Sequence, residues 1–132
     1  MRARIAIFKS QQHVLIRAVK LNNKPAEMLQ ASPKGSVPVL VIESDQNNRS
    51  PMIIEESLEV MLWALANNDP DDLLLSDNEG AVSEMATLIS EFERDFIPDF
   101  NEYSCAKRYH EDNVVECREA CGRHIQKLER RL

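Results

Sequence analysis

The sequence predicts a small α/β domain over residues 1–68, followed by an all-helical domain over residues 69–132. Two observations predict this division. The apolar residues change at Ser57 from short strand-like runs to the three- and four-residue spacing of a helix. Shortly afterwards, Asn67-Asn68-Asp69-Pro70 has the composition of a linker that stops a helix. A chain of this length buries roughly two-thirds of its unfolded surface, so it needs no disulfides to hold a core.

The first domain is predicted to begin with a helix over residues 1–10. Its apolar side chains share one side, and no capping residue precedes it. Residues 13–19 are rich in β-branched residues and predict a strand. Pro25 suits the first turn of a short helix that continues through Leu29.

A hairpin and a helix complete this domain. The apolar run 39–42 predicts a strand buried on both faces, and residues 52–54 predict its hairpin partner, with a loop over 43–51 between them. The helix that follows begins at Ser57, and its apolar positions recur with helical spacing: Leu58, Met61, Leu62 and Leu65.

The second domain is predicted to be helical throughout. One long apolar stripe precedes Pro98, which is expected to bend or end its helix. The stripe consists of Val82, Met85, Ile89, Phe92 and Phe96. A last helix is predicted from about Val114 to Leu132.

Charge and composition exclude several classes of protein. The net charge is -6, from 16 basic and 22 acidic residues, but residues 1–26 carry six basic residues and no acidic one. Those basic residues are interspersed with apolar ones and lack a set of aromatic residues for base stacking, so no nucleic-acid partner is expected. No apolar run approaches the ~20 residues of a membrane span, so no membrane association is expected. An odd, clustered set of three cysteines favours a reducing compartment, namely the cytoplasm.

Two short motifs suit the binding of a small peptide. Val37-Pro38 ends a Pro- and Gly-containing loop just before a strand, which leaves the Val37 backbone able to pair with an extended ligand. Glu56-Ser57 precedes a helix, where amide groups and a hydroxyl suit a carboxylate and the acid suits an ammonium group. The alternative interpretations are a strand-entry proline, an N-cap serine and a favourable first-turn acid.

Together with Asn23-Lys24-Pro25 before a short helix, these motifs resemble the glutathione S-transferases, most closely their cysteine-type, omega-like bacterial branch. The resemblance implies a thioredoxin-like domain followed by a helical one, in a homodimer with glutathione as co-substrate. It also implies that Val37 pairs with the cysteinyl part of glutathione ahead of a cis Pro38. Glu56 and Ser57 would hold the γ-glutamyl head group, and Lys24 the glycyl carboxylate.

The sequence departs from this family at its start. Residues 1–10 resemble the helix that follows the family's first strand and its Cys-Pro-Tyr-Ala type catalytic stretch. We therefore expect the first strand and the catalytic residue to be absent, the helical domain to be partial, and the strands at 13–19 and 39–42 to keep unpaired edges. A fragment, a chain completed by oligomerisation and a degenerate paralogue are the three interpretations, with the fragment favoured.

The family chemistry is glutathione conjugation, or thiol transfer and reduction of glutathione adducts. We expect no catalysis by this chain as it stands, because its cysteines do not map onto the family's catalytic position. The alternative function is a non-catalytic interaction module, similar to the stringent-starvation proteins that keep this fold.

Two further groups of side chains contain metal-ligating residue types. Cys117, Cys121 and His124 share one face of the last helix and could bind zinc or copper with His110, although core packing is the more common use of such cysteines. Cys105 stands apart from them. The acidic run 69–72 lacks the alternating spacing of a calcium loop and is typical of a solvated linker.

Overall fold

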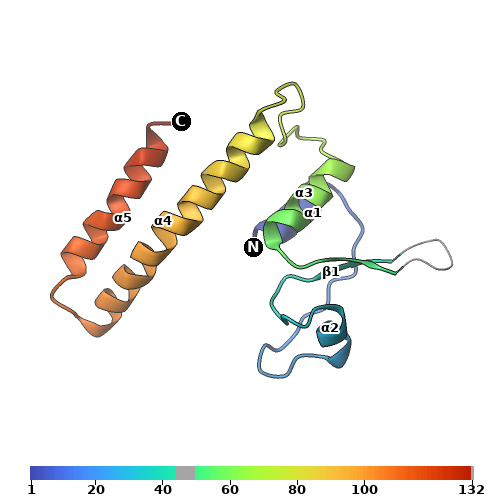
Figure 1. The fold of residues 1–132 in the computed structure, drawn as a ribbon, viewed down its shortest axis with the longest axis horizontal. Coiled ribbons are helices and arrows are strands. Elements are labelled where there is room, and N and C mark those ends of the chain that lie inside the picture. The colour runs from blue at the N-terminus through green and yellow to red at the C-terminus, as the bar shows by residue number, and fades with distance from the viewer. Residues whose placement is uncertain (44–49, 132) are drawn as a thin grey trace. The chain divides into compact units, whose positions relative to one another are not determined.

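A computed structural model describes residues 1–43 and 50–131 (Figure 1). The chain forms two compact units, Met1–Ser76 and Asp77–Leu132. The predicted domain boundary at 68/69 remains a prediction, and the short segment that follows it falls in the first unit. Among the described residues, no helix is both long and apolar enough to cross a membrane.

Two helices form the framework of the first unit. Helix α1 (Arg2–Lys9) packs along α3 (Ser57–Asn67), and Figure 1 draws α1 directly behind it. Ala3, Ala6 and Ala64 are all buried, and such small side chains let the two helices pack closely. The predicted helices over residues 1–10 and from Ser57 are therefore confirmed. No side chain makes a hydrogen bond at the N-cap of α1, as the absence of a capping residue predicted.

The core of this unit consists of two neighbouring groups of apolar residues. One contains Ala3, Ile54 and Val60, and the other contains Ala6, Ala64 and Leu65. Partly buried Ile7 and Trp63 pack against both groups, which joins the hairpin to the helix pair.

The predicted hairpin is confirmed, with one correction. Strands β1 (Leu40–Ile42) and β2 (Met52–Ile54) pair antiparallel, with Val41 opposite Ile53. The prediction that residues 39–42 are buried on both faces is wrong: Leu40 and Ile42 pack against the core, whereas Val41 is 45% exposed. Successive strand residues point to opposite faces, and only one face of this strand meets the core. Most of the predicted loop 43–51 lies outside the described residues.

The predicted strand over residues 13–19 is wrong. This segment has no regular structure, and Leu15 and Ile16 are 82% and 62% exposed. β-branched residues favour a strand because their side chains fit a pleated, half-buried sheet surface. No described strand pairs with this segment, so it has no such surface to join. Beyond it, Pro25 is the N-cap of α2 (Ala26–Ala31), which confirms the predicted short helix. In Figure 1, α2 lies on the opposite side of the hairpin from α1 and α3.

Polar contacts hold the segment after α3 against the rest of the first unit. Asn68 donates from Nδ2 to the carbonyl oxygen of Ser10 at 2.9 Å, and Lys9 pairs with Asp71 at 2.8 Å. The Asp69 carboxylate accepts the amide hydrogens of Leu73 at 2.9 Å and Leu74 at 2.7 Å. The acidic run therefore serves as a turn that seats Leu74 against the core.

The second unit is a pair of helices, α4 (Ala81–Tyr109) and α5 (Val114–Glu129), which lie side by side (Figure 1). The prediction that Pro98 could end its helix is wrong, since α4 continues for another eleven residues to Tyr109. A proline within a helix removes one backbone hydrogen bond, and the long helix tolerates that loss here. His110, in the left-handed conformation, ends α4.

Candidate functional site

A tight turn shapes the loop that precedes β1. The Gly35 amide donates to the carbonyl oxygen of Ser32 at 2.9 Å, and Gly35 has a φ of +61°. This left-handed conformation favours glycine. A Cβ atom at Gly35 would lie 3.1 Å from Leu29 Cδ2 and 3.3 Å from Lys24 Nζ. Lys24 therefore lies against this turn, although it comes from a different part of the chain.

The loop ends in a cis peptide bond between Val37 and Pro38, so the cis Pro38 implied by the resemblance is confirmed. Val37 is 52% exposed, and its backbone makes no hydrogen bond to the backbone of another described residue. Pairing of the Val37 amide and carbonyl with an extended ligand remains a prediction.

The start of α3 forms the other side of the candidate site. Glu56 occupies the N-cap position and Ser57 is the first helical residue, so the alternative interpretation of Ser57 as the N-cap is wrong. Ser57 instead directs its hydroxyl toward α1, where Oγ accepts a hydrogen bond from Arg2 Nε at 2.8 Å. The first amide groups of α3 lie beside this hydroxyl, and such a helix start favours an anion.

Two side-chain contacts join the loop to the start of α3. Ser32 donates from its hydroxyl to the Glu55 carboxylate, and Lys34 donates from Nζ to the Glu56 carboxylate. These contacts bring the loop that carries Val37 to the residues that begin α3. The structure thus links the loop that carries Val37 and Pro38, with Lys24 beside its turn, to Glu56 and Ser57 at the start of α3, and the binding role of these residues remains a prediction.

The charges at this site are mutually stabilising. A hydrogen bond from Lys34, together with the lysine's charge, lowers the pKa of the Glu56 carboxyl, and the charge of Arg2 lowers it further. The same hydrogen bond and the charge of Glu56 raise the pKa of Lys34. Both side chains are 57% exposed. Glu56 is therefore an ionised, accessible carboxylate at neutral pH.

Sequence reasoning missed two residues of this region, Arg2 and Lys34. The sequence shows Lys34 between Pro33 and Gly35 in the turn, but not its pairing with Glu56, which depends on the fold. Nothing in the sequence pattern points Arg2 toward Ser57, since that contact depends on the packing of α1 against α3.

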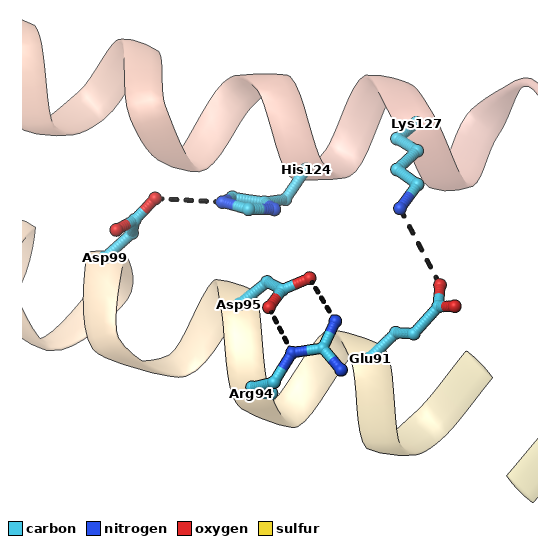
Figure 2. A network of polar contacts seen from close by, with 6 residues as sticks. All are labelled: Glu91, Arg94, Asp95, Asp99, His124 and Lys127. Atoms are coloured by element: carbon cyan, nitrogen blue, oxygen red, sulfur yellow. Dashed lines mark hydrogen bonds and ion pairs between the residues drawn. The ribbon is translucent and has the colours of Figure 1, made fainter. Parts of the chain in front are cut away.

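The candidate metal ligands of the second unit have other surroundings. Cys117 and Cys121 are buried in α5, and burial raises the pKa of the Cys117 thiol. His124 Nε2 lies 2.8 Å from Asp99 Oδ2 of α4 (Figure 2). Across residues 1–43 and 50–131, no three cysteine, histidine or acidic side chains are grouped so that they could hold a metal ion.

The hairpin, the cis-proline loop and the packed helices define the first unit as a thioredoxin-like domain, and a helical region follows it. A family model described as the N-terminal domain of glutathione S-transferase matches residues 1–72. The chain belongs to the glutathione S-transferase family. No match was found among curated proteins.

Proposed function

We propose that the first unit binds glutathione between the cis-proline loop and the start of α3. The observation that carries this proposal is the pair of contacts from Ser32 to Glu55 and from Lys34 to Glu56, which make the loop face the helix start. Because of them, a carboxylate, a hydroxyl, helix amide groups and an available backbone lie within one region. That set of groups suits a ligand with an amino acid head and an extended peptide.

Each part of glutathione has a partner in this arrangement. The ammonium of the γ-glutamyl head pairs with Glu56, and the carboxylate on the same carbon binds the Ser57 hydroxyl and the first amide groups of α3. The backbone of the cysteinyl residue pairs with Val37, and the glycyl carboxylate binds Lys24. Membership of the family supports this ligand, and the omega-like branch, a homodimer and a cytoplasmic location belong to the same proposal.

Titration calorimetry with glutathione tests the site. Glu56→Ala is expected to weaken binding about tenfold or more, because hydrogen bonds to charged groups are worth about 1.5–3 kcal/mol. Ser57→Ala should weaken it less, since the helix amide groups remain. Glu27→Ala, which removes an exposed acid from α2, is the matched control and should bind as the wild type does. Absence of saturable binding, or wild-type affinity in both site variants, would refute the proposal.

The chemistry that follows binding has two candidates. Glutathione conjugation or thiol transfer is the activity of the family, whereas a non-catalytic module would bind glutathione alone. The thiols favour the second candidate, because none of the three cysteines maps onto the family's catalytic position and burial raises the pKa of Cys117, which disfavours its thiolate.

A thiol-transfer assay with glutathione and a small disulfide separates these candidates. The chain is expected to show no turnover above the uncatalysed exchange. Turnover that disappears in Cys105→Ser, the variant of the exposed cysteine, would instead establish thiol catalysis by this chain.

A further inference from the structure

The carboxylate that the proposed site offers to a ligand ammonium already contacts an ammonium group of the protein. Lys34 Nζ donates to Glu56, so the lysine occupies the place that the γ-glutamyl ammonium would take. A ligand head group can bind Glu56 fully only if Lys34 moves.

The two contacts between the loop and the start of α3 differ in how easily a ligand could replace them. Ser32 is completely buried, so its hydrogen bond to Glu55 anchors the loop. Lys34 and Glu56 are each 57% exposed, and an exposed ion pair contributes little to stability. Lys34 can therefore leave Glu56 while Ser32 keeps the loop in place.

We propose that Lys34 is a specificity-determining residue, which leaves Glu56 when an amino acid head group binds and then pairs with the carboxylate of that head group. This inference rests on the proposed glutathione site. In an amino acid the carboxylate and the ammonium are attached to one carbon, so a carboxylate arrives next to Glu56 together with the ammonium. The flexible stem of lysine allows Nζ to follow this short displacement.

The exchange selects for the complete head group. A ligand with both charges replaces the Lys34–Glu56 pair with two new ion pairs. A ligand with the ammonium alone breaks that pair and leaves Lys34 without a partner from the ligand. Lys34 therefore penalises head groups that lack the carboxylate.

Calorimetry with two ligands tests this role. One is glutathione, and the other is its analogue in which hydrogen replaces the γ-glutamyl α-carboxylate. The analogue is expected to bind Lys34→Met about threefold more tightly than the wild type, because its competitor for Glu56 is gone. In Lys34→Met, glutathione loses both the competitor for Glu56 and the ion-pair partner of its own carboxylate. The ratio of the glutathione affinity to the analogue affinity should therefore be smaller in this variant than in the wild type.

Two control variants make the result specific to Lys34. Lys34→Arg keeps the charge and should retain the wild-type preference for glutathione. Lys9→Met removes a lysine of similar exposure that pairs with Asp71 elsewhere in the same unit, and it should leave both affinities unchanged.

The possible failures can be told apart. If the wild type binds glutathione and Glu56→Ala does not, but the analogue binds Lys34→Met no better than the wild type, the role of Lys34 is refuted and the site stands. An analogue that binds neither protein detectably would refute the role of Lys34 in the same way. If the wild type does not bind glutathione, the proposed function fails and this inference fails with it.

Discussion

The two units of this protein use polar side chains in different ways. In the first unit, polar contacts join irregular backbone to the ends of helices, as in the pairs Lys34–Glu56 and Lys9–Asp71, which are 22 and 62 residues apart. In the second unit, they join the surfaces of two long helices (Figure 2). Irregular backbone leaves main-chain groups available to a ligand, whereas the backbone groups of a helix bond to one another, so the comparison favours the first unit for the proposed binding.

In the helix pair of the second unit, by contrast, the charged side chains of one helix contact those of the other. Glu91 Oε2 of α4 lies 3.6 Å from Lys127 Nζ of α5 and 3.8 Å from a guanidinium nitrogen of Arg131, which follows that helix. The ring centroids of Phe92 and Phe96 lie 4.5 Å apart. Exposed ion pairs of this kind contribute little to stability.

The largest expected effect concerns the packing of α1 against α3. Ala64 is fully buried between these helices, and Ala64→Leu is expected to destabilise the protein by about 1–3 kcal/mol through overpacking. Ala66→Leu, two residues along the same helix at an exposed position, should change stability by less than about 0.5 kcal/mol. Urea unfolding of both variants measures the difference. Equal losses would contradict the close packing described for these helices.

Two glycines, one in each unit, give effects of opposite sign. Gly35→Ala is expected to cost about 1–2 kcal/mol, because its φ is positive and its Cβ would press on Leu29. Gly122→Ala, in α5, is expected to stabilise by about 0.5–1 kcal/mol, since nothing lies within 4 Å of the added Cβ and alanine favours a helix. Thermal unfolding reports both signs. A stabilised Gly35→Ala variant would mean that the turn before β1 is not as described.

The smallest expected effect is the pH dependence of the Lys34–Glu56 pair. Its contribution to stability is present above the pKa of an unfolded glutamate and is lost as pH falls through the lowered pKa of Glu56. On the alkaline side, it is lost as pH rises through the raised pKa of Lys34. Urea unfolding across pH should show both losses in the wild type and weaker ones in Lys34→Met. Superimposable pH profiles would show that the pair contributes nothing.

Local patterns in the sequence predicted much of the fold. The helical spacing after Ser57 predicts α3, and the two apolar runs 39–42 and 52–54 predict the hairpin. The residues of the candidate site were also predictable, because Val37-Pro38 and Glu56-Ser57 are contiguous motifs at a strand entry and a helix start. Their assembly in one region follows from the fold that these motifs share with the glutathione S-transferases.

Features that depend on tertiary contacts could not be predicted in this way. Residues 13–19 have strand composition, but a strand needs a partner, and composition does not show whether one is present. The pairing of Lys34 with Glu56 joins two segments whose local patterns are independent of each other. The burial of Val41 was overestimated for a related reason, since an apolar run does not show how many layers cover it.

The segment after α3 has a consequence for studying the first unit alone. A polypeptide cut after Asn68 would lose the Asp71 partner of Lys9, the Asp69 turn and the packing of Leu74 against the core. Its exposed apolar surface would favour self-association. A recombinant fragment meant to crystallise with a ligand should therefore extend through Ser76, where the first unit ends.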